Sequence, residues 1–536
     1  MAWVTFPVIV PPSDGGPSAV YPGAHARTTP DKPAVVMADT GDSLTYAELE
    51  ERSIRLAHVL RDEEGLARGG HVALIATNGP DVFVTYWAAV RSGLYITAVN
   101  HHLAAPEAAY VVDDCGAEVL IVSADVAPLA EALLGTTPGV RRRLAYGGPV
   151  AGHDSYEDAL AAASAQEPAD QPAGVDMLYS SGTTGRPKGI QPALPERQVH
   201  EPGDTMRAVF GPLFGFDEHT VYYSPAPTYH AAPLRFGGLV LSSGGTLVLT
   251  AGFDAWESLR VIAEHRVTHS QWVPTMFVRM LKLDESVRAA YDVSSMRVAI
   301  HAAAPCPVEV KAAMMDWWGP VLWEYYSSTE ANGITLISPQ EWFSHPGSVG
   351  QAKLGVVHIC DADDGGRELE TGEIGTIYFE RPQRPFEYHH DPERTREASH
   401  PAHENWTTTG DVGYLDEDGF LHLTDRKAFM IISGGVNIYP QEIENAMAMH
   451  PAVYDVAVIG VPDEEMGEQV KAVVQLAAGH EGTEALAAEL IEHVRASIAR
   501  YKAPRSVDFT DELPRTATGK LVKGELRARY AERTGV

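Results

Sequence analysis

A segment rich in glycine and hydroxyl groups, YSSGTTGRPKGI at residues 179–190, has the composition of a phosphate-binding loop. Glycine lets the backbone turn so that successive N–H groups face one anion, serine and threonine add short donors, and Lys188 adds a positive charge. The segment is not a Walker A loop, because glycine follows the lysine where that motif requires serine or threonine. Flexible surface loops have a similar composition, so the interpretation depends on the rest of the chain.

Two further segments offer groups suited to a nucleotide. The sequence YSSTE at residues 326–330 follows an apolar run, where a buried strand is expected to end and where ligand-facing groups lie in a doubly wound sheet. The Tyr326 ring could stack on a base, Thr329 could bind a phosphate, and Glu330 offers the hard oxygen that Mg²⁺ prefers. Asp411, in the turn sequence TTGD, is suited to accept hydrogen bonds from ribose hydroxyls. Each segment alone is more often structural than functional.

The elements that must position these groups alternate regularly through the first 330 residues. Thr45 and Glu48 form a capping box that opens a helix, and the pattern predicts strands at residues 71–76, 95–99 and 118–122 with helices between them. Such alternation is typical of parallel sheets covered by helices on both faces. Residues 140–172 are rich in Ala, Gly, Pro and acids, which predicts irregular structure.

The sequence pattern changes toward the C-terminus. Short strands punctuated by glycine predict a small antiparallel β unit at about residues 347–424, and the last 110 or so residues read as a small α+β domain. We therefore predict an α/β fold with a large N-terminal domain of doubly wound sheets, residues 1–425, which includes the β unit. A small, mobile α+β C-terminal domain, residues 426–536, follows it. A chain of 536 residues is too long for one ordinary core, and two or three domains are expected.

Charge and cysteine content restrict the partners and the compartment. The net charge of −31 opposes unspecific binding to nucleic acid or anionic lipid, so no nucleic-acid partner is expected. No apolar run has the length of a membrane span, and stable membrane insertion is not expected either. The 3 cysteines are far apart and odd in number, which favours a reducing cytoplasm over a disulfide framework. The oligomeric state stays open between monomer and homodimer.

Taken together, the segments resemble those of the adenylate-forming superfamily, which includes AMP-forming acyl-CoA synthetases, aryl-CoA ligases, peptide-synthetase adenylation domains and firefly luciferase. Besides the three segments above, the resemblance rests on DRK at residues 425–427, GGVNIYP at residues 434–440 and PRTATGK at residues 514–520. The segments occur in family order and span nearly the whole chain. The chain is most similar to AMP-forming fatty-acid or aryl-acid CoA ligases.

The resemblance implies a nucleotide site built from all of these segments. Glu330 should hold Mg²⁺, Asp411 should bind the ribose hydroxyls, and Lys520 should bridge the substrate carboxylate and the α-phosphate of ATP. Catalytic roles are implied for Lys520, Glu330, Thr183 and His230. Further nucleotide or cofactor contacts are implied for Ser180, Ser181, Gly182, Thr184, Lys188, Ala304, Pro305, Tyr326, Ser327, Thr329 and Arg426, and for Gly434 and Gly435 in the loop expected to line a thiol tunnel.

The sequence indicates the residues of the acid pocket less clearly than those of the nucleotide site. By resemblance, Tyr229 and His230 precede the pocket, with His230 as an aromatic gate beside the carboxylate. Its expected walls are Trp272, His301, Ala302 and Ala303. The alanines leave room for a substrate of some width or length. His301 stands where a small hydroxyl residue or glycine is common, so either it meets a polar substituent on the substrate or it is a hydrogen-bonded core histidine.

The implied reaction has two halves, with ATP, Mg²⁺ and CoA as cofactors and co-substrates. A carboxylate attacks ATP to give an acyl-AMP and pyrophosphate, and a thiol, most simply that of CoA, then displaces AMP. A lysine on a mobile domain predicts that the domain rotates between the halves, so that Lys520 withdraws and the glycine loop at residues 434–435 moves in. At the position where the family commonly has Asp or Lys as the pivot of this rotation, this chain has Ala428. The polar contacts that normally stabilise each of the two domain orientations are therefore in doubt.

The leading hypothesis is an ATP-dependent acid:CoA ligase that acts on a fatty or aromatic acid in the cytoplasm. Alternatives keep the adenylation but use a carrier-protein thiol or an amine as acceptor, activate nitrite for diazo formation, or oxidise the adenylate as luciferases do. A catalytically silent nucleotide-binding protein is disfavoured, because Lys188, Glu330, Asp411 and Lys520 are all present. Histidine metal sites are disfavoured by their spacing. The histidines concerned are His101, His102, His389, His390, His400 and His403.

Lys520→Ala should remove several kcal/mol of transition-state stabilisation from the adenylation half, because it deletes a preorganised cation between two anions. Thioester formation from supplied acyl-AMP should survive. Pyrophosphate exchange measures the first half, and thioester formation from acyl-AMP measures the second. Equal losses in both halves would contradict the rotation of the C-terminal domain.

Overall fold

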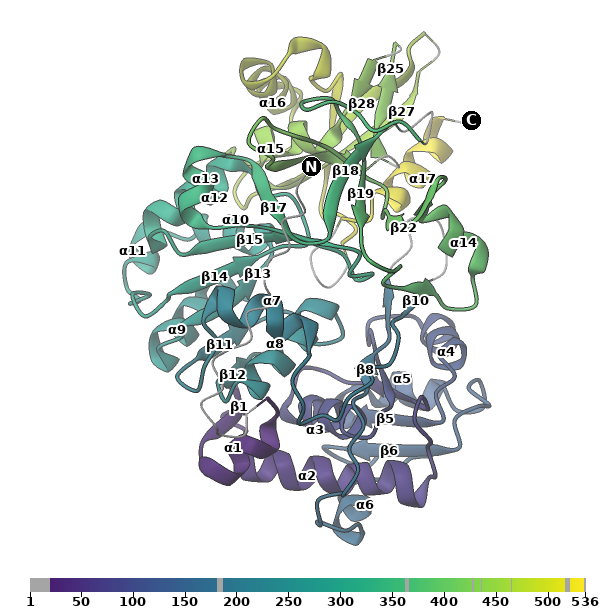
Figure 1. Cartoon of the computed structure of the whole chain (residues 1–536). Helices are drawn as coiled ribbons and strands as arrows, with labels where there is room; N and C mark the ends of the chain where they lie inside the picture. Colours follow the sequence, from purple (N-terminus) through teal and green to yellow (C-terminus); the bar gives the residue numbers. More distant parts are fainter. Residues whose placement is uncertain are drawn as a thin grey trace.

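The computed structural model of the chain describes residues 20–180, 187–361, 366–426, 429–434, 436–463, 465–515 and 521–534. Strands in these residues form four sheets, three of which belong to the large N-terminal part (Figure 1). The predicted α/β class, with doubly wound sheets followed by a smaller C-terminal α+β part, is confirmed. The boundaries at residues 425 and 426 stay a prediction.

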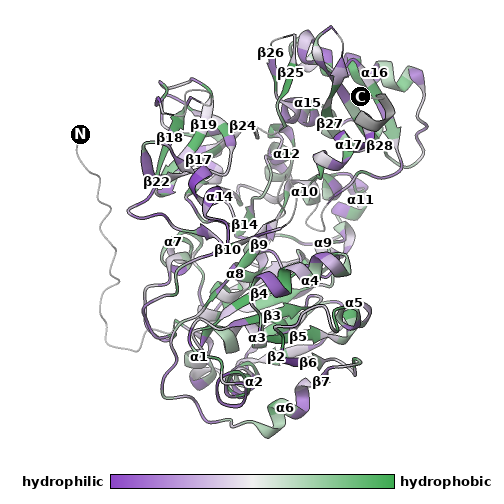
Figure 2. Ribbon diagram, turned by 90° about the vertical axis from the view of Figure 1, so that its right-hand side faces the viewer, coloured by the Kyte–Doolittle hydropathy of each residue, from purple (hydrophilic) through white to green (hydrophobic). Residues whose placement is uncertain are grey.

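The first sheet is parallel and six-stranded, in the order β7-β6-β5-β3-β4-β8. Its strands are β3 (His71–Ile75), β4 (Tyr95–Val99), β5 (Val119–Ser123), β6 (Arg142–Tyr146), β7 (Asp154–Ser155) and β8 (Val175–Asp176). Its helices are α2 (Tyr46–His58), α3 (Pro80–Val90), α4 (Ala105–Asp114), α5 (Ala127–Ala132) and α6 (Tyr156–Ala162). Thr45 and Glu48 make the predicted capping box of α2. In Figure 2 the central strands β3, β4 and β5 are mostly in the colour of hydrophobic residues, as expected for a sheet covered on both faces.

The prediction of irregular structure for residues 140–172 is wrong. Strand β6 pairs in parallel with β5, and β7 and α6 follow it. Only Leu144, Ala145 and Tyr146 of β6 are buried, after two half-buried arginines. So short an apolar run carries little periodicity, and its pairing with β5 stabilises it as a strand.

The second sheet joins parallel and antiparallel strands along one hydrogen-bonded path, β2-β1-β12-β11-β13-β14-β15-β16-β17-β24-β23-β19-β22-β21, with β18 on β19. The strands up to β15 are β1 (Pro33–Met37), β2 (Ser43–Thr45), β11 (Val221–Ser224), β12 (Thr246–Leu249), β13 (His269–Trp272), β14 (Val298–His301) and β15 (Leu322–Tyr326). From β1 through β15 the path is parallel, and from β15 onward it is antiparallel. The expected β unit therefore continues the parallel sheet through β16 and β17.

The antiparallel strands are β16 (Ile334–Ile337), β17 (Ser348–Leu354), β18 (Val356–Cys360), β19 (Gly375–Glu380), β21 (Ser399–His400), β22 (His403–Thr407), β23 (Asp411–Leu415) and β24 (Leu421–Arg426). The helices of this part are α1 (Pro22–Thr28), α7 (Thr205–Phe214), α8 (Ala231–Ser242), α9 (Ala255–His265), α10 (Pro274–Leu281), α11 (Glu285–Arg288), α12 (Val308–Trp318), α13 (Pro339–Ser344) and α14 (Pro392–Glu397). A small third sheet joins β9 (Leu178–Ser180), β10 (Lys188–Gln191) and β20 (Glu387–Tyr388).

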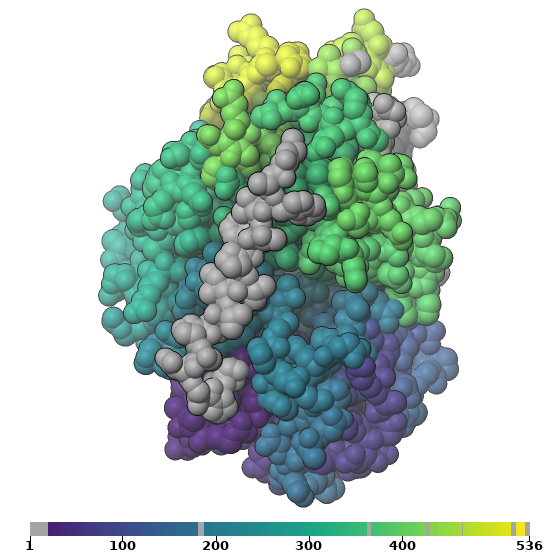
Figure 3. All heavy atoms as spheres, viewed as in Figure 1, coloured from purple at the N-terminus to yellow at the C-terminus, as the bar shows by residue number. Residues whose placement is uncertain are grey.

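The C-terminal part has a sheet of its own, in the order β26-β25-β28-β27, with β29 parallel to β28. Its strands are β25 (Ile431–Ser433), β26 (Val436–Ile438), β27 (Val453–Asp463), β28 (Gly467–Leu476) and β29 (Ser506–Thr510). Its helices are α15 (Pro440–Ala448), α16 (Glu484–Ser497) and α17 (Lys523–Thr534). Figure 3 shows this part, in yellow and yellow-green, at one end of the molecule against the green and teal residues of the large part.

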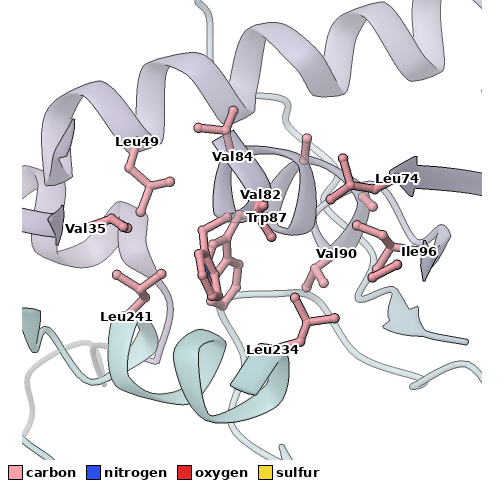
Figure 4. Packing of buried hydrophobic residues seen from close by; sticks show 14 of the residues in the cluster. Val35, Leu49, Leu74, Val82, Val84, Trp87, Val90, Ile96, Leu234 and Leu241 are labelled. Carbon is pink, nitrogen blue, oxygen red and sulfur yellow. The ribbon is translucent and has the colours of Figure 1, made fainter. Parts of the chain in front are cut away.

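Helices α3 and α8 form the main core between the two large sheets. Figure 4 shows Trp87 and its α3 neighbours facing Leu234 and Leu241 of α8. The two helices approach closely because α8 carries glycines at the contact: a Cβ added at Gly237 would lie 2.3 Å from Phe83 Cζ. Any larger residue there would separate the two sheets.

Asn78 connects the turn after β3 to the turns after β11 and β12. Its Nδ2 donates to the carbonyls of Ala226 (3.1 Å) and Thr250 (2.9 Å), and the Thr228 N–H donates to its Oδ1 (2.8 Å). The side chain is buried. One amide from the first sheet thus satisfies three backbone groups in turns of the second sheet and holds the chain immediately before Tyr229 and His230.

Asn78→Ala should lower the unfolding free energy by at least about 2 kcal/mol, because it leaves three buried backbone groups without partners at about 1–3 kcal/mol each. Thermal and urea unfolding would measure the loss. Asn78→Asp keeps the acceptor for Thr228 but places a buried carboxylate oxygen against the carbonyls of Ala226 and Thr250, so it should lose at least as much stability. An unchanged melting temperature for Asn78→Ala would contradict the bridging role.

Candidate functional site

A cavity of about 280 Å³ lies between the large part and the C-terminal part. The large part contributes residues that directly follow β13 and β14 and the last residues of β15. Because parallel strands end at one edge of their sheet, these segments meet there. The residues concerned are Val273, Pro274, Thr275, Ala303, Ala304, Pro305, Glu324, Tyr325, Tyr326 and Ser327.

Tyr326 and Asp411, predicted to contact base and ribose, lie in the wall of this cavity and touch each other. The Tyr326 hydroxyl donates to Asp411 Oδ2 at 2.8 Å, and the Thr409 hydroxyl donates to the same oxygen at 2.9 Å. Asp411 opens β23, four strands away from β15 along the sheet path. The hydrogen bonds orient the carboxylate, which is itself buried, toward one side of the cavity.

Glu330 is buried and accepts a hydrogen bond at 2.9 Å from the hydroxyl of Tyr388. Lys188 Nζ lies 5.4 Å from the centroid of the same tyrosine ring. Burial lowers the pKa of Lys188, and the nearby Arg394 lowers it further, while Glu330 opposes both. One tyrosine thus contacts an ammonium over its ring and a carboxylate at its hydroxyl.

The three-stranded sheet brings this second group together. Strand β10 pairs with β9, which places Lys188 opposite Ser180, and with β20, which places Ile190 opposite Tyr388. Sequence reasoning missed Tyr388, because nothing in its neighbourhood distinguishes it from other aromatic residues. Its pairing with β10, almost two hundred residues earlier, is what brings it to Glu330.

The turn after β15 is held by hydrogen bonds of its own. The Ser327 hydroxyl donates to the Gly333 carbonyl at 2.8 Å, and Ser328 donates to Asn332 Oδ1 at 3.0 Å. The carbonyl of Thr329 lies 3.4 Å from Arg235 Nη1, whose guanidinium is bound to buried Asp176. These bonds fix the backbone between Tyr326 and Glu330.

Tyr229 and His230 lie at the start of α8, beside the histidines that follow β4. The Tyr229 ring centroid is 5.3 Å from that of His101 and 4.5 Å from that of His230. The Tyr229 hydroxyl is buried and has no hydrogen-bond partner in the described part of the chain. It is a donor available to an anion or a polar group that enters here.

Trp272 and His301 are enclosed by the core instead of facing the cavity between the two parts. Trp272 Nε1–H donates to Ser270 Oγ at 2.6 Å, and its ring packs against Trp318. His301 is fully buried near the Lys311–Glu324 ion pair, in which Nζ and Oε2 are 2.7 Å apart. Burial, together with Lys311, holds the pKa of His301 well below its usual range. Its ring nitrogens have no hydrogen-bond partner in the described part of the chain, and Nε2 lies 3.5 Å from Glu324 Oε2, so both sequence interpretations of His301 stay predictions. Ala302 is buried beside it.

The structure describes some of the remaining predicted residues and not others. Gly434 begins the turn between β25 and β26, at the outer end of the C-terminal sheet in Figures 1 and 2. Arg515 and Leu521 pair as an antiparallel bridge, and both line the cavity. Arg426 ends β24, opposite Asp411 in the register. The other predicted residues lie outside the described ones, namely Ser181, Gly182, Thr183, Thr184, Ala428, Gly435 and Lys520.

Neither a metal cluster nor a membrane span is found in the part of the chain that the structure describes. No three His, Cys, Asp or Glu residues there are grouped to hold a metal ion. His400 and His403 instead pack around Trp406, and His389 bonds to Gln191. No described helix is both long and apolar enough to cross a bilayer.

Comparison with known proteins agrees with this geometry. A feruloyl-CoA synthase of an Amycolatopsis species is 35% identical over 516 residues, which cover 95% of this chain and 98% of that protein. A long-chain-fatty-acid–CoA ligase of Mycobacterium tuberculosis is 32% identical over 516 residues, with 95% and 97% covered. The crystal structure of the anthranilate CoA ligase AuaEII in complex with anthranoyl-AMP matches with a TM-score of 0.82 and 25% identity, covering 96% of this chain and 99% of that one.

The family of AMP-binding enzymes matches residues 23–385, and the C-terminal domain of AMP-binding enzymes matches residues 442–520. The two matches cover most of the chain and occur in the order that the motifs indicated. The chain therefore belongs to the AMP-binding enzymes, within the adenylate-forming superfamily.

Proposed function

We propose that the residues around the cavity carry out the two half-reactions of an ATP-dependent acid:CoA ligase. The protein is an AMP-forming ligase, which converts a carboxylic acid into an acyl-AMP with release of pyrophosphate and then transfers the acyl group to CoA. Relatives named as CoA ligases match nearly the whole chain. The observation that carries the assignment of residues is the contact between Tyr326 and Asp411 in the cavity wall, with Glu330, Tyr388 and Lys188 assembled close to the end of the same strand.

Tyr326 and Asp411 form the nucleoside end of the proposed site. Asp411 offers a buried carboxylate to the ribose hydroxyls, and the hydroxyls of Tyr326 and Thr409 hold it in place. A preorganised acceptor loses less freedom on binding than a mobile one. Ala304 and Pro305, on the neighbouring strand end, line the same cavity and supply an apolar surface for a flat base.

Glu330, Lys188 and Ser180 form the proposed phosphate end. Tyr388 occupies one oxygen of Glu330, so the carboxylate has remaining lone pairs for a hard cation, and Mg²⁺ is commonly held by one or two carboxylates together with phosphate oxygens. The residues present thus fit the ion, which when bound would neutralise charge on the triphosphate. Lys188 adds a cation beside it, and Thr183 and Thr184 fall between β9 and β10 in the sequence.

The acid is proposed to enter beside Tyr229 and His230, at the N-terminal end of α8. The Tyr229 hydroxyl, which has no hydrogen-bond partner among the described residues, and the N-terminus of a 12-residue helix both favour an anion at this place. We propose a fatty or aromatic acid as the substrate. Carrier-protein thiols, amines and nitrite remain the alternatives that the substrate experiment below separates.

The C-terminal part, residues 426–536, is proposed to be a mobile domain that delivers Lys520. Arg515 and Leu521, which flank Lys520 in the sequence, pair with each other and line the cavity. A cation supplied there would stand between a carboxylate and the α-phosphate. Gly434 is not among the residues that line the cavity, so rotation would be needed to bring it to the site. The cytoplasmic location rests on the cysteine pattern alone.

Tyr388→Phe should raise the KM for MgATP and the Mg²⁺ concentration that gives half-maximal rate, because Glu330 loses its hydrogen bond. A hydrogen bond to a charged group contributes about 1.5–3 kcal/mol, equivalent to roughly 10- to 100-fold in kcat/KM. Steady-state kinetics at varied ATP and Mg²⁺ would measure it. Tyr291→Phe, at a site that packs on Trp256, is the control. An unchanged Mg²⁺ dependence would contradict the role of Glu330.

Pyrophosphate release with MgATP, over a panel of fatty acids, benzoates, cinnamates and nitrite, tests the function itself. Each assay is run with and without CoA, and mass spectrometry identifies the product. An acyl-CoA from one of the acids is the expected result. AMP formation that does not depend on CoA would direct the search to a carrier protein, an amine or nitrite. The absence of pyrophosphate release with every acid would contradict the proposal.

A further inference from the structure

Helix α10 lies between the nucleotide cavity and the C-terminal domain. It directly follows β13, and its first residues, Pro274 and Thr275, line the cavity together with Val278 and Arg279 one turn later. Its last turn and the residue after it, Lys282, face the C-terminal domain. A single short helix therefore contacts both the nucleotide site and the domain proposed to rotate.

Two cations of this helix contact the start of β27. Lys282 Nζ donates a hydrogen bond to the carbonyl of Val453, and the Arg279 guanidinium carbon lies 5.6 Å from the centroid of the Tyr454 ring. Burial lowers the pKa of Lys282, and Asp455 opposes that shift. Met449, just before β27, packs against the apolar cluster of the large domain that contains α10. The contact is thus partly apolar and partly made by desolvated cations.

The same short segment of β27 holds the chain that leads to the predicted catalytic lysine. Asp455 follows Tyr454 and forms a two-pronged ion pair with Arg515, in which Nη2 and Oδ1 are 2.5 Å apart. Both side chains are largely buried, at 17% and 15% exposed. Arg515 pairs with Leu521, and both line the cavity. Residues 453–455 therefore connect α10 to the two ends of the segment that contains Lys520.

We propose that Arg279 and Lys282, through Tyr454, Val453 and the Asp455–Arg515 pair, form an interdomain latch that positions the C-terminal domain for adenylation. The proposal rests on the two-pose cycle proposed above. The latch would also supply polar contacts between the domains, which the apolar side chain of Ala428 is unable to make.

The strength of these contacts suits a latch that must open. A hydrogen bond from a lysine to a backbone carbonyl and a cation–π contact are each modest interactions, so together they favour one pose without making it permanent. The Asp455–Arg515 pair lies within the C-terminal domain and would move with it. Opening the latch would therefore release the domain from α10 while residues 515 and 521 stay attached to β27.

Arg279→Ala and Lys282→Ala test the latch through the two half-reactions. Each is expected to lower pyrophosphate exchange about fivefold to tenfold, the effect of weakening one pose by a single such contact. Thioester formation from supplied acyl-AMP should stay unchanged or become faster. Equal losses in both halves would overturn the proposal, because a merely structural role affects both.

Matched controls come from contacts of the same kind that do not cross the domain boundary. Arg288 lies over Trp317 at 5.4 Å within the large domain, and Lys502 pairs with Glu442 within the small one. Arg288→Ala and Lys502→Ala should leave the ratio of the two half-reactions unchanged. Tyr454→Phe should behave as wild type and Tyr454→Ala as Arg279→Ala, because the cation–π contact needs the ring and not the hydroxyl.

A distance measurement separates failure of the latch from failure of the proposed function, since it needs no acid. Spin labels on Glu285→Cys and Glu492→Cys, both exposed, report the distance between α11 and α16 in the full chain. Pulsed electron paramagnetic resonance should give a narrow distribution for the parent and a broader or shifted one after Arg279→Ala or Lys282→Ala. An unchanged distribution in both variants would overturn the latch, whatever acid the enzyme uses.

Discussion

The reaction proposed for this chain requires two anions, a carboxylate and a triphosphate, to meet inside a protein that itself carries a net charge of −31. Their repulsion must be offset locally, by cations and oriented dipoles in a site of low water content. Lys523 lines the cavity and Lys188 lies over the ring of Tyr388, which bonds to Glu330. Several acids that line the cavity are already engaged: Asp455 by Arg515, Glu444 by Lys523, and Glu324 by Lys311. Pairing removes much of the negative potential that these acids would otherwise direct at the substrates.

The strand order of the large sheet determines where the groups of the site lie. Strands β13, β14 and β15 are parallel, so the polar residues that follow them share one edge, and the antiparallel strands that continue the path bring Asp411 back to that edge. The three-stranded sheet adds Lys188 and Tyr388 from the other side. The nucleoside end and the phosphate end of the site thus come mainly from different sheets, which the hydrogen bond from Tyr388 to Glu330 connects.

Domain movement places a further demand on the structure, since the C-terminal domain must bind the large domain firmly enough to deliver a lysine and loosely enough to leave. The ion pairs inside the small domain, Asp455–Arg515 and Glu444–Lys523, are largely buried and keep its elements together. At α10 the described residues make weaker kinds of contact across the boundary: a hydrogen bond to a carbonyl, a cation–π contact and the apolar packing of Met449. Such a division lets the domain move as one body.

The sequence alone determined the features that depend on local chemistry: the Thr45–Glu48 capping box, strand β4, the first-turn proline of α15, the fold class and the family. Backbone geometry and short-range periodicity encode these. Only the tertiary structure decided that Tyr388 bonds to Glu330, that His301 is buried beside Lys311 and Glu324, that residues 142–146 form a strand, and that α10 contacts β27. Each of these depends on which strands and helices pack together across long stretches of chain, and a side chain's partner at that distance leaves no pattern in the residues next to it.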